Sequence, residues 1–193
     1  MKNNRTAYVI LGMLSFAPKG SGYELHKAIE ENFGSFWGES YGQIYPSLKQ
    51  LAADGLIEAC EPSGTAKKRR QEYALTEAGR AALRQWLAQP FQNDPPRNEF
   101  MLKLFFGRQA APGVALAHVH EVNRRNRQTM AQLEGIEKMA RAYQSKDPNL
   151  PYWMLTLSLG MAMTRAALEW GEAALKELSA LDESESNRAR RES

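Results

Sequence analysis

The sequence is poor in the residues that build disulfides, metal sites and membrane spans. Its 193 residues include one cysteine, Cys60, and three histidines. One cysteine cannot form an intramolecular disulfide, and no CxxC or Cys/His spacing typical of a metal site occurs. The longest nearly uncharged apolar stretch, residues 150–164, is shorter than the ~20 residues that a membrane-spanning helix needs. We therefore expect neither a membrane association nor a bound metal.

Signals for secretion and for catalysis are also missing. The basic N-terminus leads into an apolar run that no small-residue cleavage site follows, so we predict a cytoplasmic protein without a signal peptide. His118 and His120 are two residues apart and point in different directions on a helix, which makes them a poor metal pair. Cys60 has no histidine near it in sequence and reads as a small buried hydrophobe. These features predict that the protein is not an enzyme and needs no cofactor.

What is present is the composition of a globular protein with one local concentration of charge. Hydrophobic residues make up 43% of the chain and charged residues 24%, and the net charge is only +3. Neither half is strongly basic, but Lys67, Lys68, Arg69 and Arg70 are adjacent. Four neighbouring cations repel one another unless an anionic surface lies nearby. The block is a candidate phosphate contact, and a solvated basic loop without a partner is the alternative.

Proline spacing divides the chain into two parts. Three prolines and several short polar residues interrupt any regular pattern in residues 89–98. We predict a first domain over residues 1–90, a linker over 91–98 and a second domain over 99–181. Residues 182–193 are almost free of apolar side chains, and we expect a disordered tail there.

The first part shows the signals of three helices. Thr6 is positioned to cap an apolar helix that ends before Pro18. Ser21 and Glu24 have the spacing of a capping box, which opens a second helix with a buried stripe of Tyr23, Leu25, Ala28, Ile29 and Phe33. A third helix is predicted from Ser40 to Gly55, with Pro46 in its first turn and a buried stripe of Ile44, Leu48 and Leu51.

A hairpin and a fourth helix complete this part. Residues 56–60 and 71–75 read as two short strands, and the segment that joins them carries the basic block. Thr76 is positioned to cap the following helix. Three helices, a hairpin and a helix give the order of a winged helix-turn-helix in a mainly α-helical chain. The third helix is expected to expose side chains suited to a DNA major groove, namely Tyr41, Gln43, Tyr45, Ser47 and Lys49. Packing roles for Tyr41 and Tyr45 are the alternative.

Several longer stretches resemble one family of regulators. They are AYVILGML (7–14), SGYE (21–24), FW (36–37), SYGQIYPSL (40–48), DGLI (54–57), YALT (73–76) with Gly79, and EFMLKLFF (99–106). With these stretches the sequence resembles PadR-family transcriptional regulators of the longer subfamily. The resemblance implies a homodimer whose third helix enters the major groove, whose wing contacts phosphate or minor groove, and whose C-terminal helices dimerise. Carried onto this chain, the DNA-binding residues are Ser40, Tyr41, Gln43, Tyr45, Pro46 and Lys49 on the third helix, and Lys67, Lys68, Arg69 and Arg70 on the wing.

The second part shows helical periodicity that favours dimerisation. A seven-residue repeat places Val119, Asn126, Leu133 and Ala140 in one row, beside a second row of Val122, Thr129, Ile136 and Tyr143. The last helix carries a broad apolar stripe that includes Leu157, Met161, Leu168 and Leu175. We predict that Val119, Asn126, Leu133 and these four residues form a dimer interface, because one partner helix cannot cover so broad a face.

The function expected from these features is that of a homodimeric repressor which binds a palindromic operator in double-stranded DNA. Members of the resembled family often respond to small aromatic or amphipathic compounds, so a small aromatic effector is expected. His118, Tyr152 and Trp153 are the candidate lining of its pocket, although aromatics at a helix start can equally be core residues. The alternatives are a winged-helix module that binds protein and an activator without a small-molecule effector.

Overall fold

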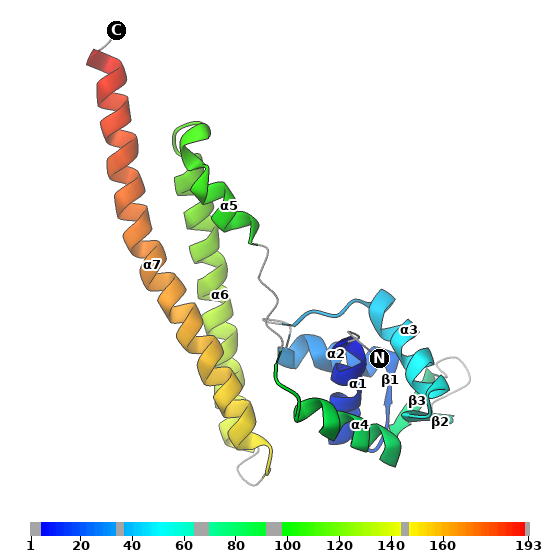
Figure 1. Ribbon diagram of the computed structural model, residues 1–193. Helices are drawn as coiled ribbons and strands as arrows, with labels where there is room; N and C mark the ends of the chain where they lie inside the picture. The colour runs from blue at the N-terminus through cyan, green and yellow to red at the C-terminus, as the bar shows by residue number, and fades with distance from the viewer. Residues whose placement is uncertain (1–4, 34–36, 64–69, 92–97, 144–146, 192–193) are drawn as a thin grey trace. The chain divides into compact units, whose positions relative to one another are not determined.

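The computed structural model describes residues 5–33, 37–63, 70–91, 98–143 and 147–191 (Figure 1). Contacts between residues divide the chain into two compact units, Met1–Asp94 and Pro95–Ser193. The chain is mainly helical with one small antiparallel sheet, which confirms the predicted fold class. Across the described ranges, none of the helices has the length and apolar character needed to cross a bilayer.

The first unit is a helical core with a three-stranded sheet along one side. Its elements are α1 (Arg5–Phe16), β1 (Gly20–Ser21), α2 (Gly22–Phe33), α3 (Tyr41–Ala53), β2 (Ile57–Ser63), β3 (Arg70–Leu75) and α4 (Glu77–Leu87). The strand order is β1-β3-β2, and both pairings are antiparallel. The predicted hairpin is therefore present as β2 and β3. The two-residue strand β1, which the sequence did not indicate, pairs with β3 at Tyr73 and Glu72.

The core of this unit is built from one face of each helix. Buried aliphatic side chains come from α1, α2 and α3 and are completed by the first residue of β2 and the last of β3; they are Ile10, Leu11, Leu14, Leu25, Ile29, Ile44, Leu48, Leu51, Ile57 and Leu75. Burial of each aliphatic side chain contributes about 1.5–3 kcal/mol of transfer free energy. This shared core holds α2 and α3 in a fixed mutual orientation.

The joint between the hairpin and α4 depends on a glycine. The Thr76 hydroxyl accepts a hydrogen bond from the Gly79 N–H at 3.1 Å, which confirms Thr76 as the cap of α4. A Cβ added at Gly79 would lie 2.0 Å from the backbone oxygen of Leu56. Because that oxygen belongs to backbone and cannot move aside, only glycine allows α4 to begin so close to β2.

Thr6 does not cap α1 as predicted. It lies inside the first turn, because α1 begins at Arg5, and its side-chain hydroxyl donates to a carboxylate oxygen of Glu39 at 2.9 Å. The indole N–H of Trp37 donates to the other Glu39 oxygen at 2.7 Å. The Glu39 carboxylate thus ties the segment before α3 to α1.

The second unit is built around two long antiparallel helices. It contains α5 (Glu99–Phe105), the short 3-10 helix η1 (Gly107–Gln109), α6 (Val114–Tyr143) and α7 (Leu150–Arg191), and α6 and α7 lie side by side (Figure 1). The helix α7 continues through Arg191, although a disordered tail was predicted for residues 182–193. Glu, Arg and Ala in this segment favour helix, and extending a formed helix needs no new nucleation.

The packing of α6 on α7 corrects part of the predicted dimer seam. Val119, Leu133 and Leu157 are buried within the single chain, so they cannot meet a second copy. Asn126, Met161, Leu168 and Leu175 are half-buried. For Val119, Leu133 and Leu157, the surface that covers the predicted seam is the neighbouring helix of the same chain. Sequence periodicity alone does not distinguish an intrachain seam from an interchain one.

Candidate nucleic-acid interface

The start of α3 is defined by a reciprocal cap. Ser40 adopts an extended conformation before the helix, and its backbone N–H and its hydroxyl both donate to the Gln43 side-chain oxygen, at 3.0 and 2.9 Å. This capping box of Ser40 and Gln43 fixes Tyr41 as the first helical residue. Pro46 consequently lies in the second turn and not in the first as predicted, and it cannot donate the usual hydrogen bond to the Gly42 carbonyl.

One face of α3 is open and polar. Ile44, Leu48 and Leu51 are buried in the core, as predicted. The opposite face exposes five of the residues assigned to DNA binding, which are Tyr41, Gln43, Tyr45, Pro46 and Lys49, and the cap residue Ser40 is exposed beside them. Ser47 was also expected on this face but is buried, because it lies one turn from Ile44 and Leu51 on the core side.

The two tyrosines of α3 are held by ring contacts with α2. The Tyr41 ring is stacked on His26, with centroids 3.8 Å apart and planes 9° from parallel, and Tyr45 follows at 6.2 Å from Tyr41. A Cβ added at Gly22 would lie 2.9 Å from the Tyr45 ring, so Gly22 allows that ring to rest on the start of α2. Tyr41 and Tyr45 nevertheless remain 42% and 48% exposed. They are packed on one side and accessible on the other.

Gln43 has a double role that the sequence did not reveal. Its Oε1 is engaged by the cap, which leaves its side-chain Nε2 group as the outward donor. A donor of this kind can bond to acceptor positions such as purine N7 or guanine O6 in a major groove. Gln43 therefore both orders the helix start and presents a hydrogen-bond donor.

Only part of the basic wing is described. Lys67, Lys68 and Arg69 lie outside the described residues, whereas Arg70 begins β3 and is exposed. The Arg70 guanidinium carbon lies 4.1 Å from the centroid of the Tyr23 ring. Tyr23 was predicted to be a buried stripe residue of α2, but it is 42% exposed, because it lies on the side of α2 that faces the wing.

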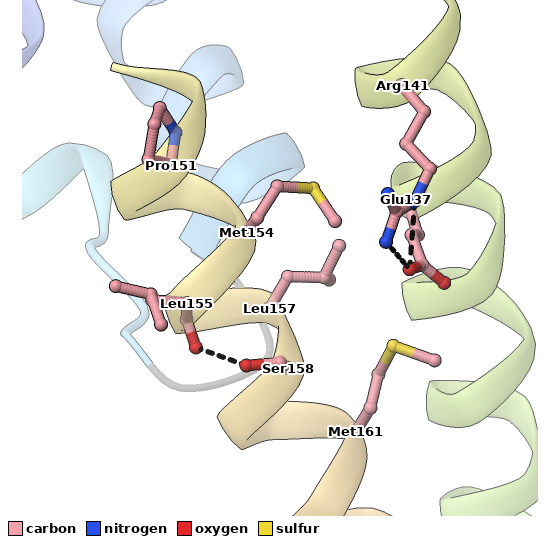
Figure 2. Close-up of a pocket in the computed structure, with 8 residues that line it drawn as sticks. All are labelled: Glu137, Arg141, Pro151, Met154, Leu155, Leu157, Ser158 and Met161. Carbon is pink, nitrogen blue, oxygen red and sulfur yellow. Dashed lines mark hydrogen bonds and ion pairs between the residues drawn. The ribbon is translucent and has the colours of Figure 1, made fainter. Parts of the chain in front are cut away.

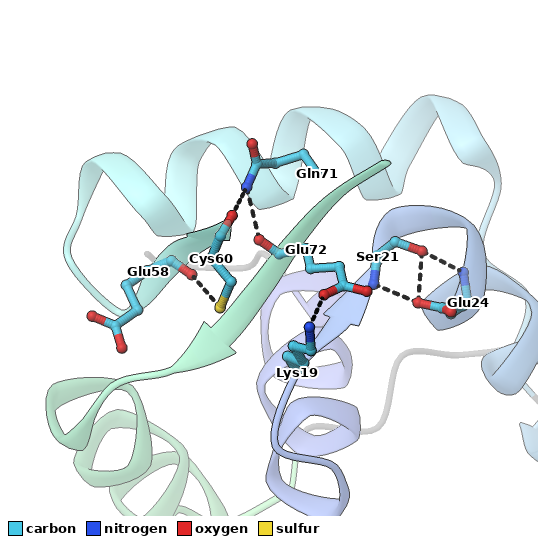
Figure 3. A network of polar contacts seen from close by, with 7 residues as sticks. All are labelled: Lys19, Ser21, Glu24, Glu58, Cys60, Gln71 and Glu72. Carbon is cyan, nitrogen blue, oxygen red and sulfur yellow. Dashed lines mark hydrogen bonds and ion pairs between the residues drawn. The ribbon is translucent and has the colours of Figure 1, made fainter. Parts of the chain in front are cut away.

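A polar network joins the base of the wing to α2 (Figure 3). The Lys19 ammonium forms an ion pair with Glu72 of β3 at 2.5 Å, and the hydrogen bond with Glu72 raises the pKa of Lys19. The Glu24 carboxylate accepts from the backbone N–H and the hydroxyl of Ser21, at 2.9 and 2.8 Å, which confirms the capping box. These bonds, the backbone one first, lower the pKa of Glu24. Because Ser21 of β1 pairs with Glu72 of β3, these two groups of contacts anchor the wing beside the start of α2.

The second unit does not bring the predicted effector residues together. His118 lies in the first turns of α6, in a groove of about 370 Å³ lined also by Leu102, Phe106 and Val114. Tyr152 and Trp153 lie at the start of α7, which packs beside the end of α6. With a rise of 1.5 Å per residue, His118 lies roughly 35 Å along α6 from the end that packs beside the start of α7. Within one chain, the predicted pocket of His118, Tyr152 and Trp153 does not form.

A second groove lies at the far end of the helix pair. It has a volume of about 470 Å³, and its walls are Met154, Leu157 and Met161 of α7 facing Glu137 and Arg141 of α6 (Figure 2). The Arg141 guanidinium donates to Glu137 at 2.8 Å and so neutralises the polar wall. Neither groove contains a cluster suited to metal binding, and no group of three or more His, Cys, Asp or Glu side chains in the described ranges could hold a metal ion.

Comparisons with known proteins agree with this architecture. Residues 10–85 match the transcriptional regulator PadR-like family, and residues 96–179 match a domain described as virulence activator alpha C-term. The negative transcriptional regulator PadR of Bacillus subtilis is 38% identical over 103 residues, which span 51% of this chain and 54% of that relative. The chain thus spans about half the length of this curated relative.

Two solved structures cover nearly the whole chain. The structure of Bacillus subtilis PadR in complex with operator DNA is 25% identical with a TM-score of 0.76, and the match covers 89% of this chain and 98% of that one. The Vibrio cholerae virulence activator AphA is 27% identical with a TM-score of 0.70, and the match covers 91% and 99% of the two chains. The PadR-like match lies in the first unit, and the virulence activator match lies in the second. Residues 10–85 thus carry a domain of the transcriptional regulator PadR-like family and residues 96–179 a virulence activator alpha C-terminal domain, and the chain is similar along most of its length to transcriptional regulators.

Proposed function

We propose that the chain is a sequence-specific DNA-binding regulator that inserts α3 into the major groove. The observation that carries this proposal is the exposed face of α3, where Tyr41, Gln43, Tyr45 and Lys49 project from a helix whose other face is buried in the core. A helix of this kind fits the width of the major groove, and the side chains supply a donor, a cation and aromatic edges. The likeness to the operator complex of Bacillus subtilis PadR supports the same assignment.

The wing supplies the contact that does not depend on base sequence. Lys67, Lys68, Arg69 and Arg70 neutralise backbone phosphates and release counterions, which makes affinity fall steeply with salt. We assign the domain roles accordingly: residues 1–90 bind DNA, residues 91–98 form the linker, and residues 99–181 assemble the protein and receive the effector.

The assembling surface that we propose differs from the one expected from the sequence. On α7, exposed apolar side chains recur at spacings of three, four, four and seven residues, and we call them the α7 stripe: Tyr152, Leu155, Leu159, Met163 and Trp170. The stripe lies on the side of α7 opposite Leu157, which is buried on the side that packs against α6. An exposed apolar face of roughly 27 Å is typical of a protein interface. A homodimer formed through it presents two α3 helices to a palindromic operator.

The regulator acts as a repressor in the cytoplasm, and a small aromatic effector controls it. The name of the Bacillus subtilis relative, a negative regulator, supports repression. Of the two grooves in the second unit, the one beside His118 is the better site for the effector, because Leu102, Phe106 and Val114 provide apolar walls around one polar side chain.

The experiment is to sequence the fragments of the native genome that the purified protein retains, and then to footprint the enriched site. We expect a palindrome whose half-sites are about 10–10.5 base pairs apart, or a multiple of that spacing, occupied by a dimer in sedimentation velocity. Enrichment of no sequence, together with elution from heparin at low salt, contradicts DNA binding and favours a winged helix that binds protein.

A further inference from the structure

We propose that Tyr23 positions Arg70 and that the two residues form a preformed contact for a backbone phosphate of DNA. The inference rests on the proposed function and adds α2 to the interface that α3 and the wing form. Tyr23 is the second residue of α2, and Arg70 is the first residue of β3. The contact therefore joins two residues that are 47 positions apart in sequence.

The geometry is that of a cation–π contact at an accessible site. The guanidinium carbon of Arg70 is 4.1 Å from the Tyr23 ring centroid, well within the ~6 Å at which such contacts stabilise. Both side chains are exposed. Tyr23 interrupts the buried stripe of α2, in which Leu25 and Ile29 face the core. An exposed tyrosine beneath an exposed arginine therefore has a role other than core packing.

The contact leaves the hydrogen-bonding capacity of Arg70 available. A cation–π contact uses the flat face of the guanidinium, whereas its N–H donors point outward in the plane and match a phosphate in a bidentate arrangement. Within the described part of the chain, no carboxylate forms an ion pair with Arg70. The nearby Glu24 carboxylate accepts from the Ser21 N–H and hydroxyl through one oxygen and attracts Arg70 electrostatically without forming an ion pair with it. The donors of Arg70 thus remain accessible to an anion from solution.

Tyr23 contributes to DNA binding by ordering the Arg70 side chain before DNA arrives. A free arginine side chain loses much rotamer freedom when it binds a phosphate, and this loss weakens binding. Stacking on Tyr23 restricts Arg70 before DNA arrives. The base of the wing is itself anchored, because Glu72 of the same strand pairs with Lys19. The guanidinium is therefore held beside the start of α2.

The test is a double-mutant cycle on DNA affinity with Tyr23→Leu, Arg70→Ala and the double variant. Two probes are used: the enriched genomic fragment and an unrelated duplex of equal length. Tyr23→Leu should weaken binding to both duplexes by about 2- to 5-fold, as a phosphate contact predicts, without changing the salt dependence. Arg70→Ala should lower the slope of log affinity against log salt by about 0.9. In the Arg70→Ala background, Tyr23→Leu should have no further effect.

Controls separate positioning from folding and from the proposed function itself. Tyr23→Phe retains the ring and should bind within twofold of the wild type, and Arg84→Ala removes an exposed cation of α4 without changing the salt slope. If Tyr23→Leu lowers the melting temperature, Tyr23→Gln repeats the cycle with a polar side chain suited to this exposed position. Wild-type protein that binds neither duplex contradicts the proposed function. A different outcome overturns only the positioning role of Tyr23. In that outcome the wild type binds DNA, but Tyr23→Leu lowers the affinity equally whether residue 70 is Arg or Ala.

Discussion

The Asn123 side chain of α6 packs directly against Gly171 of α7, so closely that a Cβ added at Gly171 would lie 1.9 Å from the asparagine Oδ1. Asn123 is fully buried, and neither its Oδ1 nor its Nδ2 has a hydrogen-bond partner among the described residues. At this contact one helix carries a small polar side chain and the other carries none, so the backbone of α7 comes close to the side chain of α6. This contact sets the register of the long helix pair.

Replacement of Gly171 should separate the helices. Gly171→Ala is expected to lower the free energy of unfolding by about 1–3 kcal/mol, because the added methyl group overlaps a side chain that has no room to move. Chemical denaturation measures the change. Gly135→Ala is the matched control, since Gly135 is exposed on α6 with nothing within 4 Å, and alanine there should stabilise by about 0.5–1 kcal/mol.

The same contact predicts a rescue. Asn123→Ala removes two buried polar atoms without partners and also makes room for the new methyl group. Asn123→Ala combined with Gly171→Ala should therefore be more stable than Gly171→Ala alone. A double variant as unstable as the sum of the two single changes would show that the overlap lies elsewhere.

Gln43 allows capping and DNA reading to be separated. Gln43→Ala removes the acceptor for Ser40 and should lower stability by about 0.5–1.5 kcal/mol as well as sequence preference. Gln43→Glu keeps an oxygen acceptor at this position and adds a negative charge at a helix N-terminus, so its melting temperature should equal or exceed that of the wild type. The same charge faces DNA phosphates and should weaken binding to every duplex. Gel-shift titrations and thermal melts on both variants check this, and unchanged DNA affinity of Gln43→Glu would remove Gln43 from the interface.

The α7 stripe predicts where charge disrupts the dimer. Leu159→Asp combined with Met163→Asp should give a folded monomer, because both side chains are exposed in the single chain and a carboxylate is costly only if a second copy covers it. Sedimentation velocity measures the oligomeric state, and far-UV circular dichroism measures whether the helices remain folded. Arg165→Asp changes the charge of the same helix away from the stripe and should remain dimeric. By contrast, aspartate at Leu168 or Leu175, on the side facing α6, should destabilise the helix pair itself.

Glu121 should titrate far below an ordinary glutamate. Its carboxylate accepts hydrogen bonds from Arg124 and Arg125 at 2.7–2.8 Å, and these bonds lower its pKa from 4.5 to about 2. Because the folded-state pKa is depressed, the ionised carboxylate stabilises the fold above the unfolded-state pKa, and this contribution disappears as the pH falls through about 2. Glu121→Gln should therefore lower the melting temperature at pH 7 but not near pH 2. An NMR titration of the Glu121 carboxyl carbon checks the pKa directly.

Much of the first unit follows from local signals in the sequence. Ser21 with Glu24 and Thr76 with Gly79 form caps within three residues, and such short-range chemistry is visible in the order of residues. The core positions Ile10, Leu14, Leu25, Ile29, Ile44 and Leu48 follow from helical periodicity, and all six are buried, whereas Leu83 is only half-buried. The motifs from SYGQIYPSL to EFMLKLFF were sufficient to identify the family.

The tertiary structure decided which partner each apolar or aromatic face meets. Periodicity marked Val119, Leu133 and Leu157 as interface residues, but only the packing of α6 on α7 shows that the interface lies within one chain. Tyr23 appeared to continue a buried stripe, yet the return of the chain through β3 places Arg70 over its ring. A sequence specifies which residues avoid water and which turns can form, because these are properties of neighbouring positions. The pairing of surfaces that are tens of residues apart depends on how the elements pack, and it becomes visible only in the folded chain.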